Sequence, residues 1–334
     1  DRVLANIAAV APGSADHLIA QAYYTYYVIK DYDLAHEIAS QAQALAPSDA
    51  RLAEMKSWIE RRQGDYDAFI ESKRLVRSLD PRNKRWARSL ITSLIQAHRY
   101  EEAWAELESV ENPGYSERMM GVMLRAREHR DLPRVAADLE ALNQDFGGNA
   151  PPDMLIFVRT FARDYSGALE ALASVPDPAE GDRPPRLGVP DKLMSELQIR
   201  WLMGDEDRVA TLLAQAHAIL ESREPDGSHL DGRAVLGEAI LAAYEGETQK
   251  AEQLVRRWYR EGARDWPERV NQADLTCQIL AMAGAAEAAV DCLRTALVTP
   301  SYVTPFLEPY MSFYDGIREE PVFVELLAEL ESQE

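Results

Sequence analysis

The sequence lacks the short motifs by which most enzymes and metal proteins are found. Its two cysteines do not form Cys-x-x-Cys, and none of its six histidines belongs to a His-x-x-x-His pair, so a structural zinc site is not expected. It has no glycine-rich phosphate loop and no Gly-x-Ser-x-Gly. We therefore expect no catalytic residues, no cofactor and no metal, and a protein that is not an enzyme.

Long apolar runs and a basic surplus are also absent. A helix that spans a bilayer needs about 18 or more apolar residues, and no stretch approaches this, so we expect no direct membrane insertion of this segment. The net charge is −20, whereas a protein that binds nucleic acid needs a large cationic surface, so we expect no nucleic-acid partner. Asp1 opens directly on amphipathic sequence, which we interpret as a mature product or a piece of a longer protein. A cytoplasmic and an extracytoplasmic location both stay open.

What the sequence does contain is a repeat. Tyr32, Tyr66 and Tyr100 occur in similar phrases and are 34 residues apart. Pro47 and Pro81 share this spacing. Two unrelated markers with one period of 34 residues indicate stacked helical hairpins.

Apolar residues at helical spacing extend this pattern along the chain. Residues 1–10 are expected to be the second helix of a repeat whose first helix is missing. We expect hairpins that turn near Lys30, Gly64, His98, Asp131, Arg163, Gly204, Gly246 and Gly284; their ranges are about 14–45, 48–79, 82–110, 114–143, 151–174, 190–221, 230–262 and 267–298. The sequence therefore predicts an all-α fold, an α-solenoid of stacked antiparallel hairpins, closed by a C-terminal capping helix near Val324–Leu330.

Residues 176–190 contain five prolines and two glycines and cannot be helical throughout. They form either a long loop between repeats or a joint between two solenoid segments. We accordingly divide the chain into N-terminal repeats (1–175), a connecting loop (176–190), and longer C-terminal hairpins with the capping helix (191–334).

The first hairpin resembles the tetratricopeptide repeat (TPR) family, whose pattern has an alanine early in the second helix and a proline at the junction. The residues that fit are Ala35, Ala39, Ala42 and Pro47. In the third hairpin and the junction after it, the fit is moderate, at Ala103, Leu107 and Pro113. The second hairpin departs from the pattern at Phe69 and Lys73. The resemblance implies a TPR-like superhelix that serves as a protein-binding scaffold.

The end of the chain resembles the TPR arrays of bacterial signalling and regulatory proteins, which follow cyclase, kinase or winged-helix domains. The matching residues are Asp315, Ile317, Arg318, Pro321, Phe323 and Leu327, together with the junction Leu79–Asn83. This resemblance implies a module of a larger bacterial signalling protein.

In the TPR family, residues of the first helix of each hairpin line an inner groove. Carried onto this sequence, the groove residues are His17, Tyr24, Tyr27, Arg51, Glu54, Trp58, Arg61, Arg62, Arg85, Arg88, Gln96 and Phe157. Arginines bind carboxylates through two parallel hydrogen bonds, and Tyr and Trp supply rigid contact area. We therefore expect a protein or peptide partner, acidic or carboxylate-terminated. The alternative is that these arginines are solvated or pair with acids of neighbouring helices.

The two cysteines face each other in the last predicted hairpin, because Cys277 precedes Gly284 by seven residues and Cys292 follows it by eight. Two closely packed helices can bring such positions within disulfide distance. In an oxidising compartment a bridge would form. Otherwise Cys277 and Cys292 are two buried, small apolar residues.

The leading hypothesis is a non-catalytic protein-interaction scaffold. A second hypothesis is a sensor domain that binds a small ligand, with the region 176–231 lining the pocket, and passes the signal to a missing effector. A third is an all-helical enzyme, which no group of reactive residues in the sequence supports.

Overall fold

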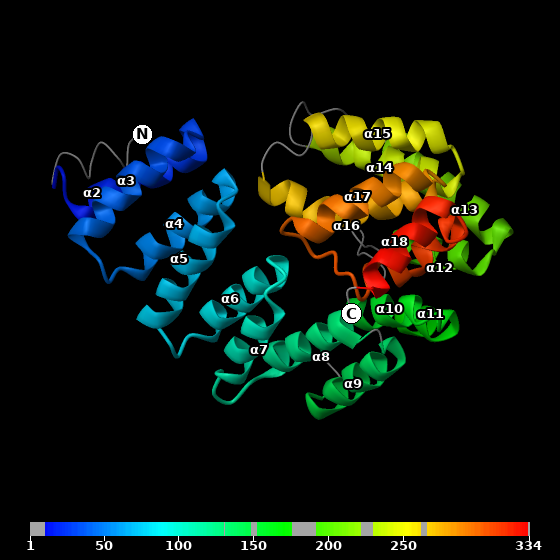
Figure 1. Ribbon diagram of the computed structural model, residues 1–334, viewed down its shortest axis with the longest axis horizontal. Helices are drawn as coiled ribbons and strands as arrows, with labels where there is room; N and C mark the ends of the chain where they lie inside the picture. The colour runs from blue at the N-terminus through cyan, green and yellow to red at the C-terminus, as the bar shows by residue number, and fades with distance from the viewer. Residues whose placement is uncertain are drawn as a thin grey trace. The chain divides into compact units, whose positions relative to one another are not determined.

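The structure is a computed structural model that describes residues 11–129, 131–147, 152–175, 192–221, 230–261 and 266–332 (Figure 1). The described residues are mostly helical and contain no strand, which confirms the predicted all-α fold. The chain divides into two compact units. The N-terminal unit is Asp1–Pro113 with Asp265–Val270, and the C-terminal unit is Gly114–Arg264 with Asn271–Glu334. The predicted helix 1–10 and loop 176–190 lie outside the described residues, and the domain division based on that loop stays a prediction.

The N-terminal unit contains three consecutive hairpins (Figure 1). In the first, α2 continues into a short π-helix, η1, before the chain turns into α3. The helices of this unit are α2 (Ala15–Tyr24), η1 (Thr25–Ile29), α3 (Tyr32–Leu45), α4 (Ala50–Gln63), α5 (Tyr66–Leu79), α6 (Lys84–Gln96) and α7 (Tyr100–Glu108). These bounds agree with the predicted hairpins.

The 34-residue period marks where each second helix begins, since Tyr32, Tyr66 and Tyr100 are the first residues of α3, α5 and α7. Asp31 and Asp65 cap the first two of these helices, each carboxylate accepting a backbone hydrogen bond of 3.0 Å. The turns before them contain left-handed residues: Lys30 at φ 60°, Gly64 at φ 80° and His98 at φ 58°. Only the glycine adopts this conformation without steric cost.

Small residues bring the two helices of the first hairpin together. Ala35, Ala39 and Ala42 of α3 are completely buried, and the first two pack in one apolar cluster with Met55 and Ile59 of the next hairpin. The first hairpin therefore buries its apolar face against the second, as the repeat pattern predicts.

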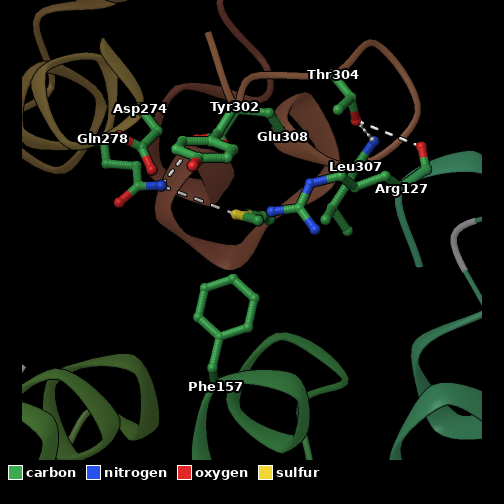
Figure 2. Close-up of a pocket in the computed structure, with 9 residues that line it drawn as sticks. Arg127, Phe157, Asp274, Gln278, Tyr302, Thr304, Leu307 and Glu308 are labelled. Carbon is green, nitrogen blue, oxygen red and sulfur yellow. Dashed lines mark hydrogen bonds between the residues drawn. The ribbon is translucent and has the colours of Figure 1, made fainter. Parts of the chain in front are cut away.

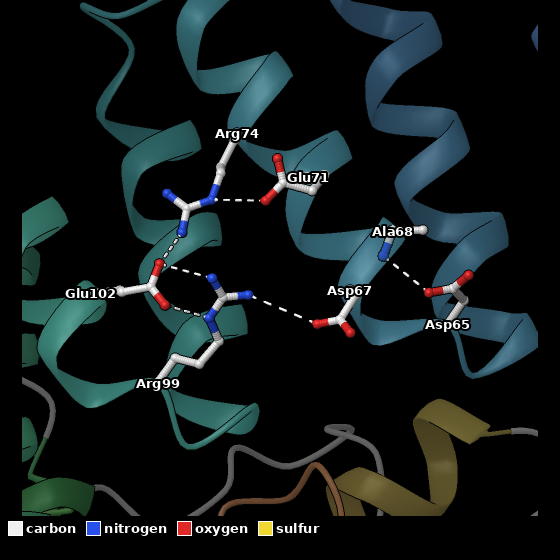
Figure 3. Close-up of polar contacts among 7 residues, drawn as sticks. All are labelled: Asp65, Asp67, Ala68, Glu71, Arg74, Arg99 and Glu102. Carbon is white, nitrogen blue, oxygen red and sulfur yellow. Dashed lines mark hydrogen bonds and ion pairs between the residues drawn. The ribbon is translucent and has the colours of Figure 1, made fainter.

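The second helices α5 and α7 are joined by ion pairs (Figure 3). Glu102 on α7 accepts from Arg74 on α5 and, at 2.8 Å, from Arg99. Arg77 on α5 likewise donates to Glu106 on α7 at 2.6 Å. Hydrogen bonding from Arg99 lowers the pKa of the Glu102 carboxyl. On this side of the unit, these arginines are paired with acids.

The C-terminal unit continues the series of hairpins and ends in irregular turns and a final helix (Figure 1). Its helices are α8 (Tyr115–His129), α9 (Leu132–Asp145), α10 (Asp153–Phe161), α11 (Tyr165–Ala173), α12 (Lys192–Met203), α13 (Glu206–Glu221), α14 (Leu230–Tyr244), α15 (Thr248–Glu261), α16 (Trp266–Met282), α17 (Ala286–Val298), η2 (Glu308–Tyr310), η3 (Ser312–Ile317) and α18 (Pro321–Glu331). α16 begins within the segment that belongs to the N-terminal unit. The predicted capping helix is confirmed as α18, which packs on α17.

The residues that resemble signalling arrays, which we call the C-terminal phrase (315–327), have a packing role. Phe323 on α18 stacks on Tyr314 with ring centres 5.7 Å apart, and both are completely buried. Ile317 is also buried. Asp315 accepts hydrogen bonds from Arg163 at 2.9 Å and from Arg318 at 2.8 Å. The packing and hydrogen bonds of these residues stabilise the cap, and this explains their presence without a role in signalling.

The cysteines of the last hairpin are joined. Cys277 on α16 and Cys292 on α17 form a disulfide, with Cα atoms 5.4 Å apart. Of the two interpretations that the sequence left open, the structure contains the bridge.

Candidate functional site

An aromatic cluster lies on the first helices of the N-terminal unit. It consists of Tyr23, Tyr26, Tyr27 and Trp58. The Trp58 ring on α4 lies 6.2 Å from that of Tyr23 and 6.4 Å from that of Tyr26. Tyr27 packs 4.8 Å from Tyr26 and stays 58 % exposed. The cluster offers rigid rings at the surface, the contact type that suits peptide binding.

Several predicted groove arginines have partners within the chain. Arg51 pairs with Asp49 at 2.6 Å and with Asp16 on α2 at 3.5 Å. Arg85 on α6 pairs with Glu54 on α4 at 3.3 Å. For Arg51 and Arg85, the alternative interpretation, pairing with nearby acids, therefore applies. The Arg51–Asp16 and Arg85–Glu54 contacts each join consecutive first helices, which places α2, α4 and α6 along one face.

Arg61 and Lys73 behave differently. The Arg61 guanidinium and the Lys73 ammonium lie 5.8 Å and 5.6 Å from the centre of the same Phe69 ring. Arg61 Nε is buried and has no hydrogen-bond partner among the described residues. Lys73 is only 6 % exposed, and no ion pair or hydrogen bond of its ammonium is found within the described ranges. A buried charge without a partner is costly, so this position calls for a counter-charge.

The electrostatics of Lys73 connect it to the other first-helix charges. Burial lowers the pKa of the Lys73 ammonium to about 8; Glu54 opposes this change, while Arg61 and Arg85 add to it. We call Arg61, Lys73 and Arg85 the basic cluster. Its three cations face one nearby acid, Glu54, which leaves the cluster positive. Burial and the Glu54 carboxylate also raise the pKa of Tyr23, so the aromatic and basic clusters adjoin.

Replacing Lys73 with Met is expected to stabilise the N-terminal unit at neutral pH by up to about 3 kcal/mol, because it removes a buried charge. Between pH 8 and 10.5 the unfolded chain keeps the proton that folded Lys73 has released. Stability of the wild type should therefore rise with pH across this range, and that of Lys73→Met should not. Urea unfolding at several pH values measures both effects.

The exposed Lys30→Met is the matched control for this experiment, and its expected change in stability is within about 0.5 kcal/mol. A wild-type stability that stays constant between pH 8 and 10.5 would contradict the depressed pKa.

The remaining predicted groove residues are dispersed. Tyr24 is half-buried at the end of α2 and makes no ring contact with the described residues. Arg88 is half-buried on α6. The others serve local structure: His17 accepts from Gly13 N at 3.0 Å, Arg62 donates to Tyr26 at 3.0 Å, and Gln96 is buried beside Tyr66. Phe157 belongs to the C-terminal unit. The groove assignment as a whole stays a prediction.

Sequence reasoning missed three residues of this surface: Tyr23, Tyr26 and Lys73. Tyr23 and Tyr26 are not among the family groove positions carried onto the first hairpin, which are His17, Tyr24 and Tyr27. Lys73 did carry a signal, because a lysine in a second helix where small or aromatic residues are usual is itself an anomaly.

A second candidate site is a cavity of about 40 Å³ in the C-terminal unit (Figure 2). Arg127 of α8 reaches in from one side, Asp274 and Gln278 of α16 lie opposite, and the Phe157 ring of α10 faces them. The segment after α17 completes the lining with Tyr302 and Glu308, among others. This cavity is not the pocket lined by 176–231 that the sequence suggested, because no residue of α12 or α13 lines it. Residues 176–191 and 222–229 lie outside the described residues, so that hypothesis stays a prediction.

Comparison with known proteins identifies no family. No protein-family model matches the chain, and no curated protein matches it. Among solved structures, a chain of Naa15/Naa10 bound to HypK-THB matches 99 % of this chain at 13 % identity with a TM-score of 0.35. This protein spans about half of that chain (48 %). The P58(IPK) TPR domain matches 95 % of this chain and 97 % of its own, at 11 % identity and a TM-score of 0.27. Likenesses this distant do not decide a partner.

The described ranges contain neither a membrane-spanning helix nor a metal-binding group of side chains. None of the helices there is both long and apolar enough to cross a bilayer. In the same ranges, no three His, Cys, Asp or Glu side chains are grouped so that they could hold a metal ion.

Proposed function

We propose that this protein is a non-catalytic protein-interaction module, and that its N-terminal unit binds an acidic or carboxylate-terminated peptide. The observation that carries the proposal is Lys73, a residue only 6 % exposed whose ammonium lies on the Phe69 ring and has no ion pair or hydrogen bond among the described residues. Proteins tolerate such a group chiefly where function needs it. A carboxylate of the partner would supply the missing counter-charge.

The surroundings of Lys73 support this choice of ligand. Arg85 is 66 % exposed and marks the solvent side of the basic cluster. Trp58 and Arg61 lie three residues apart on α4 and therefore share one side of that helix. A peptide would thus lay side chains on the aromatic cluster while its carboxylate meets the guanidiniums.

The test uses the full chain and fluorescence anisotropy with three short labelled peptides: one rich in Asp and Glu with a free C-terminus, its C-terminally amidated form, and one rich in Lys. The acidic peptide should bind, more weakly at high salt, and the Lys-rich peptide should not. The double change Arg61→Gln with Lys73→Met should weaken binding by tenfold or more, because a hydrogen bond to a charged group contributes about 1.5–3 kcal/mol.

Arg82→Gln is the matched control, because Arg82 is exposed in the turn before α6, and it should leave the affinity unchanged. A weaker affinity of the amidated peptide would assign the site to a C-terminal carboxylate. Equal affinity of the wild type and the double variant for the acidic peptide would refute the proposal.

The wider context, a module of a larger bacterial signalling or regulatory protein, is a further proposal. Its support is the C-terminal phrase and the junction Leu79–Asn83, and the residues of that phrase with packing roles include Ile317 and Phe323. Reading the gene upstream of the codon for Asp1 tests it. An in-frame effector domain is the expected result, and an initiating Met directly before Asp1 would contradict it.

A sensor that binds a small ligand is the second candidate function. The cavity of the C-terminal unit favours it, because polar and aromatic side chains from separate helices converge there.

A further inference from the structure

The cavity in the C-terminal unit contains a carboxylate with one oxygen that no other group in the described residues satisfies. Glu308 is only 4 % exposed. Gln278 Nε2 and the Tyr314 hydroxyl both donate to its Oε1, each at 2.9 Å. Among the described residues, both hydrogen bonds to this carboxylate go to Oε1, and none reaches Oε2. Oε2 therefore accepts nothing from these residues, and it belongs to a group that lines a cavity, where a ligand can reach it.

A second carboxylate and one guanidinium share this space. Asp274 lines the same cavity from α16. Arg127 stacks 5.8 Å from the centre of the Tyr302 ring. Burial raises the pKa of both carboxyls, and the Arg127 charge opposes this change. With both acids ionised, two negative charges face one positive charge. The cavity therefore favours a cation and disfavours an anion.

We infer that this cavity binds the primary ammonium group of a small amine. An ammonium has three N–H donors and no acceptor, which matches the unsatisfied Glu308 Oε2 and the neighbouring Asp274 carboxylate. The Phe157 ring supplies an apolar wall that also attracts a cation. This inference does not depend on the proposed peptide surface, because every lining residue belongs to the C-terminal unit.

The size of the cavity restricts the ligand. A water needs about 10–15 Å³ measured in this way, so a cavity of about 40 Å³ admits an ammonium with one or two carbons. A quaternary ammonium is too bulky and lacks N–H donors. A longer amine would have to place the rest of its chain outside.

The charge of Glu308 also predicts a pH dependence. Burial raises its pKa to about 7, Asp274 adds to this, and Gln278, Tyr314 and Arg127 oppose it. Glu308 must lose its proton to hold an ammonium, so affinity should rise as the pH increases. Between pH 6 and pH 8 the ionised fraction of a group with a pKa of about 7 rises about tenfold.

Isothermal titration calorimetry on the full chain with ethylammonium chloride tests the inference, with sodium chloride and tetramethylammonium chloride as controls. Ethylammonium should bind saturably with a Kd of about 1 mM or weaker, the limit for so few atoms, and the two control salts should not bind. Glu308→Gln, which preserves shape, should weaken binding by about tenfold or more. The exposed Glu325→Gln on α18 should leave it unchanged.

Asp274→Asn is a second variant with the same expected loss, and circular dichroism verifies that each variant folds. Nα-acetyl-lysine amide distinguishes the two sources of an ammonium: tighter binding than ethylammonium assigns the site to a lysine side chain, and weaker binding to a free amine. The inference is overturned if ethylammonium gives no saturable heat. It is equally overturned if folded Glu308→Gln and Asp274→Asn bind as the wild type does, or if tetramethylammonium binds as well.

Discussion

Phe323→Ala is expected to destabilise the C-terminal unit by about 3–5 kcal/mol. The ring is completely buried and stacks on Tyr314, itself completely buried, so truncation leaves a cavity that neighbouring side chains cannot fill without moving. In an array whose hairpins contact mainly their neighbours, loss of the cap should open the last hairpin first. Amide hydrogen exchange of α17 and α18 should therefore accelerate more than that of α14 and α15.

Val324→Ala is the matched control on the same helix. Val324 is 51 % exposed, so the expected loss is about 0.5 kcal/mol or less. Similar exchange rates in Phe323→Ala and Val324→Ala would show that α18 is not the cap of the array.

Removing the disulfide is the second change with a large expected effect. The double variant Cys277→Ala with Cys292→Ala should lose about 3 kcal/mol of stability in the C-terminal unit, as expected for a closed loop of about 15 residues. The bridge links positions 15 residues apart, so it restricts the unfolded chain. Chemical denaturation followed by hydrogen exchange in α16 and α17 measures the loss.

Reduced wild-type protein is the natural control, since it keeps both sulfurs in place and lacks only the bond. Its stability should fall close to that of the double variant. Titration of two free thiols in the denatured, unreduced protein would contradict the bridge and restore the interpretation of two buried cysteines.

The repeat architecture could be predicted because it depends on residues that are close together in the sequence. Tyr32, Tyr66 and Tyr100 mark the first residues of second helices, and the residues at the turns, such as Gly64, mark where first helices end. Capping, turn conformation and helical spacing depend on residues within about one or two turns of each other. The hairpins and the capping helix could therefore be predicted from the sequence.

The candidate sites could be predicted only in part from the sequence. Carrying family positions onto the sequence selected Trp58 and Arg61 of the proposed surface, but it also selected Arg51 and Arg85, which pair with Asp16 and Glu54 of neighbouring helices. Whether an arginine is available depends on acids from other helices. Periodicity specifies which residues share a helix face and does not specify the partner across the gap.

By itself, the sequence determined the class of fold, the hairpin boundaries and the absence of catalytic motifs, since these follow from spacing and composition. The tertiary structure alone decided that Lys73 is buried without an ion pair or hydrogen bond of its ammonium among the described residues, and that Arg127 lies beside acids from α16 and the C-terminal segment. Thr304 in that segment donates to the Arg127 carbonyl across 177 residues of chain. Contacts over such separations depend on how successive hairpins stack, a geometry that no local pattern encodes.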